Sequence, residues 1–161
     1  MIKIGHGYDS HRLKDGEFIM IGGVKIHSKK SVVAHSDGDV LIHALCDALL
    51  GALGKGDMGL YFDSSEKYKN MDSVFFLKET TKMLNKQSFC IVNIDTTVVT
   101  EKPPISRHAE EIRKNLSKIM KIDKNLINIK SKSNDKLGYV GRHEGIEAYA
   151  TVLIEEKWFY S

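Results

Sequence analysis

The sequence contains little cysteine, little proline and no long apolar run. Only two Cys and two Pro occur among its 161 residues. Cys46 falls in an apolar stretch and Cys90 in a predicted strand, and no Cys-x-x-Cys pair is present. We therefore expect neither a disulfide framework nor a thiolate metal site, and we expect a reducing compartment. No apolar run approaches the roughly 18 residues of a membrane span, and a strand pattern begins at Ile2, so we expect no membrane role and no signal or transit peptide within these residues. A precursor whose leader had been removed would have the same sequence.

The sequence also lacks a strong excess of either positive or negative charge. The 24 Lys and Arg residues are interspersed with 21 Asp and Glu residues, which gives a net charge of +3. No basic arm or basic amphipathic helix results, so nucleic acid is not an expected partner, whereas a small anionic substrate is compatible with this charge. Hydrophobic residues make up 42% of the chain, and no linker or repeat divides it. We therefore expect one domain, residues 1–161.

Apolar periodicity predicts alternating strands and helices. Strands are expected at residues 2–10, around Phe18–Ile26, and at Phe89–Thr100, Leu126–Ser131 and Gly145–Glu155. Helices are expected at 39–53, at 72–86, and from the prolines at 103–104 to Met120. This order predicts an α+β fold, with a single mixed β-sheet and helices packed on one face.

The last predicted strand carries small residues on its apolar face. Ala148 and Ala150 share this face with the larger side chains of Val152 and Ile154. Such small residues indicate either a close approach of helices or contact with another subunit. The sequence does not choose between the two.

The most informative stretch, Ala34–Leu53, sets polar residues into an otherwise apolar helix. A helix beginning near Gly38 places Asp39, His43 and Asp47 on one stripe, because they are spaced at i, i+4 and i+8. Carboxylates without partners are costly on such an apolar segment. The stripe therefore predicts a polar site.

Asp9 and His11 complete a candidate metal site with His43. Two residues apart in an extended segment, Asp9 and His11 point the same way. Three N and O ligands leave a fourth tetrahedral position open, as a catalytic zinc requires. The spacing alone is not decisive, because a single His on an apolar helix is more often a hydrogen-bonded core residue. For Asp39 we favour a charge effect in the first helical turn, and for Asp47 a partner that orients His43.

Six ordered sequence blocks carry a resemblance over nearly the whole chain. They are G-H-G-Y-D-S-H from Gly5, I-G-G-V from Ile21, A-H-S-D-G-D-V-L-I-H-A-L from Ala34, D-A-L-L-G-A from Asp47, G-D-M-G from Gly56 and K-L-G-Y-V-G-R from Lys136. In these blocks the chain resembles the 2-C-methyl-D-erythritol 2,4-cyclodiphosphate synthase family of the non-mevalonate isoprenoid pathway. Such ordered agreement leaves little room for accident.

The resemblance implies a ferredoxin-like homotrimer with active sites between subunits. It implies Zn²⁺, or another divalent metal such as Mn²⁺, at Asp9, His11 and His43, and Mg²⁺ at Asp135. The implied substrate is a small cytidine diphosphate compound, 4-diphosphocytidyl-2-C-methyl-D-erythritol 2-phosphate. Its 2-phosphate attacks the β-phosphorus, giving the cyclic diphosphate and CMP. A phosphate monoester is largely dianionic at neutral pH, so no protein nucleophile is needed.

The resemblance also implies a role for each matching residue. His35 and Ser133 match the positions that stabilise the charge developing at phosphorus. Taken alone, each has a structural explanation, as a loop residue bonded to backbone and as a turn hydroxyl. The residues implied to bind substrate are Asp9, Ser10, His11, His35, Ser36, Asp57, Met58, Gly59, Phe62, Asp63, Thr100, Glu101, Lys102, Pro103, Pro104, Ile105, Ser106, Lys132, Ser133, Asn134, Asp135, Tyr139 and Arg142.

The chain departs from the family pattern in three places. Pro-Asp usually follows the Phe at position 62, whereas here Asp63 and Ser64 follow, so the erythritol-binding carboxylate is either Asp63 shifted by one residue or missing. Pro104 stands where Lys is common, which leaves Lys102 as a substitute. Lys132 replaces a usual Thr, and either adds a cation to the pocket or points to solvent.

Two other classes of function compete with the synthase. A metal-dependent phosphohydrolase would use the same triad with water as nucleophile, and a trimeric nucleotide-binding module would use the histidines structurally. The chain is rich in Lys and poor in Arg, which hints at an AT-rich genome. We expect a plastid-type organelle if the source is eukaryotic and the cytoplasm if it is bacterial.

Overall fold

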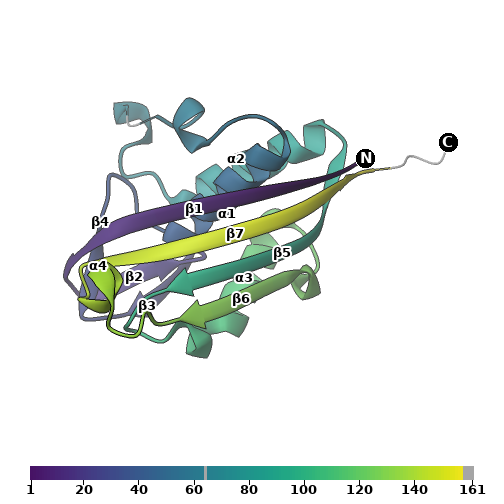
Figure 1. Ribbon diagram of the computed structural model, residues 1–161. Coiled ribbons are helices and arrows are strands. Elements are labelled where there is room, and N and C mark those ends of the chain that lie inside the picture. The colour runs from purple at the N-terminus through teal and green to yellow at the C-terminus, as the bar shows by residue number, and fades with distance from the viewer. Residues whose placement is uncertain (64, 158–161) are drawn as a thin grey trace.

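The computed structural model describes residues 1–63 and 65–157. Its main layer is a five-stranded sheet in the order β4-β1-β7-β5-β6 (Figure 1). β5 and β6 pair in parallel, and the other neighbouring strands pair antiparallel. The strands are β1 (Ile2–Asp15), β4 (Lys30–Val33), β5 (Phe89–Val99), β6 (Ile127–Lys132) and β7 (Gly145–Glu156).

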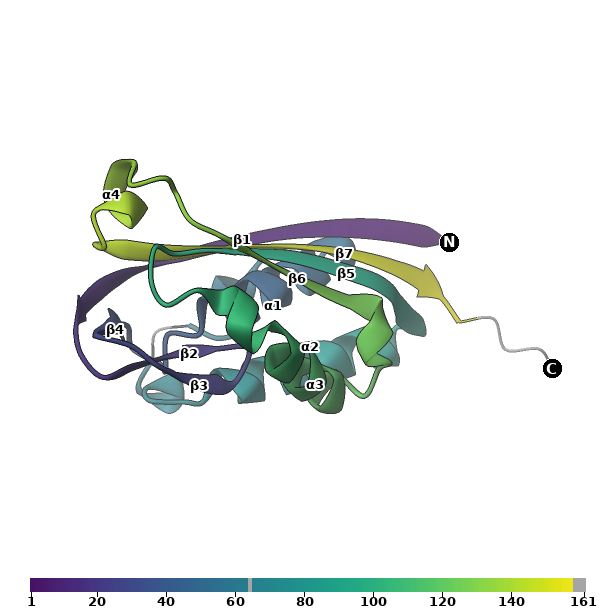
Figure 2. The ribbon, with the colours of Figure 1, turned by 90° about the horizontal axis from the view of Figure 1, so that it is seen from below.

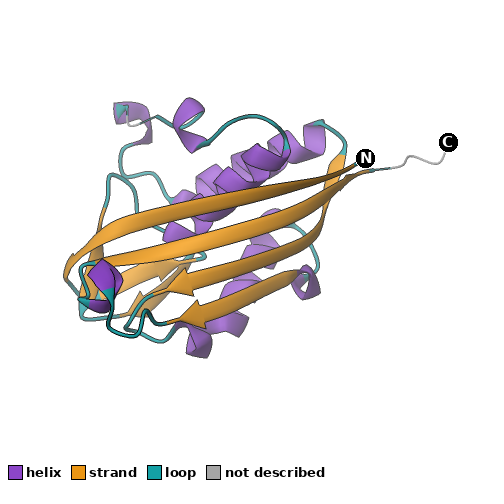
Figure 3. Ribbon diagram, in the orientation of Figure 1, coloured by secondary structure: helices purple, strands orange, loops and turns teal. Residues whose placement is uncertain are grey.

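Three helices cover one face of this sheet, namely α1 (Val40–Ala52), α2 (Ser73–Lys86) and α3 (Ala109–Met120) (Figures 2 and 3). A separate hairpin of β2 (Phe18–Ile21) and β3 (Val24–His27) lies on the same side. The single turn α4 (Gly138–Gly141) sits at one end of the sheet, on its other side (Figure 2). Among the described residues, no helix is both long and apolar enough to cross a membrane.

The predicted α+β class, with a mixed sheet and helices on one face, is confirmed. Three details are wrong. β1 continues to Asp15, beyond its predicted end at residue 10. The segment around 18–26 forms a separate two-stranded sheet and does not join the main one, and β4 and α4 were not predicted. The element order is also not ferredoxin-like, because α3 joins the parallel strands β5 and β6, and β7 follows β6 without a helix of comparable length. The single-domain assignment for 1–161 stays a prediction.

Helix α1 packs unusually close to β1 and β7. A Cβ added to Gly7 would lie 1.9 Å from the Ala44 carbonyl oxygen, so only glycine fits there. Ala150 pairs with Gly7 across the strands, and Ala148 and Ala150 are both fully buried. Close approach of a helix is therefore the explanation for these small residues. This close approach also brings His43, the residue before Ala44, within reach of β1.

Candidate metal centre

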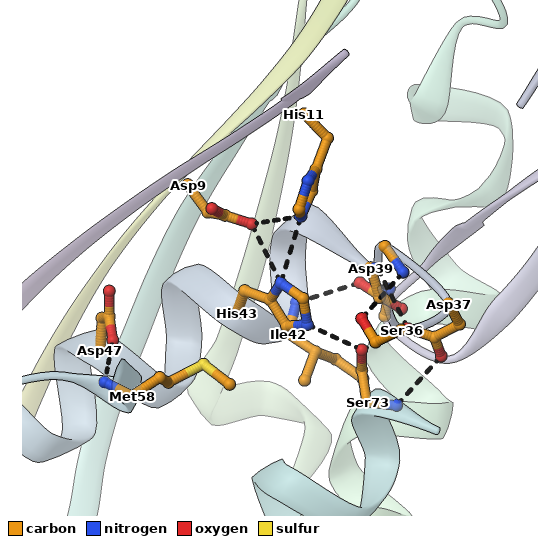
Figure 4. Close-up of polar contacts among 12 residues, drawn as sticks. Asp9, His11, Ser36, Asp37, Asp39, Ile42, His43, Asp47, Met58 and Ser73 are labelled. Carbon is orange, nitrogen blue, oxygen red and sulfur yellow. Dashed lines mark hydrogen bonds and ion pairs between the residues drawn. The ribbon is translucent and has the colours of Figure 1, made fainter. Parts of the chain in front are cut away.

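Three side chains from β1 and α1 converge on one point (Figure 4). Asp9 Oδ2 lies 2.9 Å from His11 Nε2 and 3.1 Å from His43 Nδ1. The two ring nitrogens are 3.2 Å apart. Asp9 and His11 share the helix-covered face because they are two residues apart in a strand, and His43 reaches them because α1 rests on Gly7. The predicted triad is brought together.

The spacing of these atoms fits a divalent metal ion. Ligand atoms bound at about 2.0–2.1 Å to a tetrahedral zinc lie about 3.3 Å from one another. Their mutual distances in the structure, 2.9 Å, 3.1 Å and 3.2 Å, are close to that value. Two imidazole nitrogens and one carboxylate oxygen are also ligands that zinc accepts. The three residues could hold such an ion without rearranging the backbone.

The electrostatics of the cluster favour a bound cation. Burial disfavours the charged form of Asp9, but hydrogen bonds and charge interactions with His11 and His43 outweigh it and lower the Asp9 pKa. Burial likewise disfavours protonated His43, but the hydrogen bond and charge of Asp9 outweigh it and raise the His43 pKa. The Asp9 carboxylate is thus held ionised beside two ring nitrogens, which is the charge state that a metal ligand needs.

The other ring nitrogen of His43 is held by Ser73 and, behind it, Asp37 (Figure 4). His43 Nε2 lies 2.9 Å from Ser73 Oγ, and the Ser73 hydroxyl donates to Asp37 Oδ1 in a short hydrogen bond. The Ser73 hydroxyl has one proton, and it donates that proton to Asp37. Ser73 Oγ therefore accepts the hydrogen bond from His43, which requires a proton on His43 Nε2. The lone pair of neutral His43 is then on Nδ1, facing Asp9. A metal cation or a second proton must lie between them.

Sequence reasoning missed this support for His43. Asp37 lies inside the H-S-D-G-D motif, but nothing local marks Ser73 as its partner across 36 positions. Asp37 Oδ2 also accepts the Ser73 backbone N–H at 3.0 Å, which fixes the first residue of α2. The role that we predicted for Asp47, orienting His43, therefore falls to Ser73.

Asp39 and Asp47 each hold a loop in place. Asp39 is the N-cap of α1, is fully buried, and accepts the backbone N–H groups of Gly22, Gly23 and Ile42 at 2.9 Å, 2.7 Å and 3.0 Å. The predicted charge in the first helical turn is thus replaced by hydrogen bonds at the N-cap, and burial raises the pKa of Asp39. Asp47 accepts the Met58 N–H at 2.8 Å.

The triad opens into a cavity of about 280 Å³. Its wall combines predicted site residues with an aromatic group that the sequence did not point to. The predicted residues that line it are Asp9, His11, His35, Ser36, His43, Met58, Phe62 and Asp63. Asp47, from the predicted polar stripe, also lines it, and the added residues are Ala34, Ser65, Tyr68, Lys69 and Phe76. Ser64 lies outside the described residues, so the shift proposed for Asp63 stays a prediction.

A second group of predicted residues gathers at the far ends of β5 and β6. We call residues 100–106 and 132–136 the loop pair. Thr100 N donates to Lys132 O at 2.9 Å, which joins the two segments. In the sheet, β6 is separated from β1 by β7 and β5, a distance of roughly 14 Å at about 4.8 Å per strand. Within one chain, the loop pair and the triad do not form a single site.

The remaining predicted residues take other positions. Ser10 points away from the helices and, with Tyr139 and Arg142, lines a second hollow of about 450 Å³. Lys102, Pro103 and Pro104 border a third hollow with the turn between β3 and β4. Asp57 and Gly59 flank Met58 in the loop after α1, Ile105 is buried, and Ser106 is exposed. Their substrate contacts stay predictions.

Fold and site together define an α+β protein with a candidate divalent-metal centre at the mouth of a cavity. Among known proteins, the model of the YgbB family matches residues 2–155, so the chain belongs to the YgbB family. A similar protein is the 2-C-methyl-D-erythritol 2,4-cyclodiphosphate synthase of Fusobacterium nucleatum, which is 44% identical over 158 residues, covering 98% of this chain and 99% of the relative.

Two solved structures are also similar. IspF of Plasmodium falciparum, in complex with CDP, is 37% identical with a TM-score of 0.87, covering 98% of this chain and 97% of that one. The bifunctional IspDF of Campylobacter jejuni is 35% identical with a TM-score of 0.93, and the match covers 98% of this chain and 43% of that one. The family expected from the sequence blocks is therefore confirmed.

Proposed function

We propose that the Asp9–His11–His43 triad is the metal centre at which this chain carries out the reaction of its family. Family membership and relatives matched over nearly their whole length show 2-C-methyl-D-erythritol 2,4-cyclodiphosphate synthase function. The substrate is 4-diphosphocytidyl-2-C-methyl-D-erythritol 2-phosphate, and the products are 2-C-methyl-D-erythritol 2,4-cyclodiphosphate and CMP. The reaction class is that of a cyclising phosphorus–oxygen lyase. The convergent triad beside a cavity is the observation that carries this proposal.

In this proposal the protein positions the substrate and stabilises charge. The oxygen of the substrate's 2-phosphate attacks the β-phosphorus, and the bond to the CMP oxygen breaks, so neither a protein nucleophile nor water takes part. Asp9, His11 and His43 would hold Zn²⁺ or Mn²⁺ and Asp135 would hold Mg²⁺, and these ions would neutralise phosphate oxygens when bound. His35, on the cavity wall, and Ser133 donate to the reacting phosphate. Holding both phosphates in line could supply several of the ~7–11 kcal/mol available to well-oriented intramolecular reactions.

We also propose that the complete site forms between subunits of a homotrimer. Two observations support this. The triad and the loop pair lie on strands that are not adjacent, so a neighbouring subunit is needed to bring them together. Gly5 and Gly7 of β1 face α1, so Ile2 and Ile4 point from the opposite face of the sheet, where they are 68% and 69% exposed. Apolar groups gathered on an uncovered sheet face are typical of an interface.

Product analysis tests the reaction directly. The purified protein is incubated with the cytidylated substrate and a divalent metal, and the products are identified by mass spectrometry. The synthase gives the cyclic diphosphate and CMP without inorganic phosphate. Release of phosphate would instead indicate a phosphohydrolase, and binding without turnover would indicate a nucleotide-binding module. The cellular compartment stays a prediction.

A further inference from the structure

Glu101 joins the two halves of the loop pair through a single carboxylate oxygen. Its Oε1 accepts the backbone N–H of Asn134 at 2.8 Å and that of Lys136 at 3.2 Å. The β5–β6 ladder reaches its end one residue earlier, where Thr100 N donates to Lys132 O. Glu101 therefore continues the connection between the segments beyond the point where backbone pairing stops.

The segment that Glu101 holds is in an unfavourable backbone conformation. Asp135 and Lys136 both have positive φ, 51° and 59°. Consecutive non-glycine residues in this region are uncommon and persist only where their surroundings hold them. On the other side, α4 packs against the same turn so closely that a Cβ on Gly141 would lie 2.1 Å from the Lys136 carbonyl carbon. The turn is thus fixed between Glu101 and α4.

We propose that Glu101 is a positioning residue that fixes the directions of Ser133 and Asp135. The carboxylate acts on the backbone of the turn, in place of the substrate contact that the family resemblance implies for it. Ser133 directly precedes one of the two bonded N–H groups, and Asp135 lies between them. This inference rests on the proposed function, which gives Ser133 and Asp135 their roles at the reacting phosphates and at magnesium.

Two substitutions separate positioning from direct contact. Glu101→Gln keeps a carbonyl oxygen that can accept both N–H groups but removes the charge, whereas Glu101→Ala removes the acceptor. We expect Glu101→Gln to keep turnover within a few-fold of the parent protein. We expect Glu101→Ala to lower kcat roughly 10-fold or more and to raise the magnesium concentration needed for half-maximal rate, because small misplacements of reacting groups are costly. Triad metal content should not change in either variant.

Hydrogen exchange gives a readout that does not depend on turnover. Because a hydrogen bond to a charged acceptor is lost, backbone amides of residues 132–138 should exchange roughly 10-fold faster in Glu101→Ala and close to the parent rate in Glu101→Gln. Glu111→Ala is the control, since Glu111 is exposed on α3 and outside the loop pair. It should leave both exchange and turnover unchanged.

The outcomes distinguish this inference from the proposed function. If Glu101→Gln loses as much activity as Glu101→Ala, the charge contacts substrate or metal, and the positioning role is wrong. If exchange in Glu101→Ala matches the parent protein, Glu101 does not hold the turn. If the parent protein makes no cyclic diphosphate, the proposed function fails, while the exchange measurement still decides whether Glu101 fixes the segment.

Discussion

The metal centre and the loop pair are built by different means. At the metal centre, Asp9 and His11 are side chains of a continuous strand, and His43 belongs to a helix seated on that strand. In the loop pair, the candidate residues follow the ends of strands and include backbone with positive φ. Hydrogen bonds such as Thr100 N to Lys132 O and the pair accepted by Glu101 hold these segments together.

This difference has a consequence for how each region responds to substitution. The triad geometry is set by the strand and helix, which are stabilised by many buried apolar contacts independent of the three ligands. Removing a ligand should therefore remove the metal and leave the fold. The loop pair depends on individual polar contacts, so substitutions there should have graded effects on binding and rate.

The largest expected effect is the loss of metal in His43→Ala. Metal binding and turnover should be abolished, with a fall in rate of roughly 1,000-fold or more, because both metal affinity and charge stabilisation are lost. The proposed trimer should still form, because α1 is held by its buried Leu and Val side chains. Elemental analysis and gel filtration measure both. A variant that keeps one zinc per chain with near-normal activity would refute the triad. His27→Ala, an exposed histidine outside the triad, is the control.

The same difference explains what the sequence could predict. Asp9, His11 and His43 follow from residue spacing in regular elements, since side-chain direction in strands and helices is periodic. The support that Ser73 and Asp37 give His43 did not follow, because it depends on how the N-terminus of α2 meets a loop 36 residues away. Glu101 was implied to bind substrate, but its contacts with the turn at 134–136 could not be predicted for the same reason. Its partners are backbone N–H groups, which carry no residue-type signal.

The next largest effect is expected in the loop pair, for Asp135→Asn. Removing one charged oxygen near the phosphates should cost roughly 2–4 kcal/mol of transition-state stabilisation, with other charge-stabilising donors as the guide. Turnover should fall about 30- to 1,000-fold, while the metal content of the triad stays at the parent level. Steady-state rates at increasing magnesium measure the effect, and added magnesium should restore part of the rate. Loss of the triad metal, or a parent rate, would contradict the separation between the two regions.

A smaller effect is expected at the metal centre when the hydrogen bond that orients His43 is removed. Ser73→Ala deletes the acceptor that holds the Nε2 proton of His43. Metal affinity should fall about 10- to 100-fold, the range typical of such supporting hydrogen bonds. Competition with a chelator of known affinity measures it. Ser28→Ala is a matched control, because Ser28 is also buried but its hydroxyl accepts from Lys30 N, away from the triad. Equal affinities in the two variants would show that Ser73 does not orient His43.

The smallest expected effect concerns recognition of the base. Backbone groups after Thr100 should bind the cytosine edge, so cytidine diphosphate should bind more tightly than uridine diphosphate. Because cytosine and uracil exchange donor and acceptor at two positions, the exocyclic group on C4 and ring N3, the difference should be that of a hydrogen bond or two, roughly 3- to 10-fold in affinity. Calorimetry with both nucleotides measures this, and the two share the same diphosphate as an internal control. Since backbone groups make the contact, Lys102→Ala should keep the preference while it weakens both ligands alike. Equal affinities in the parent protein would indicate a site that binds phosphate without reading the base, and would favour the phosphohydrolase over the synthase.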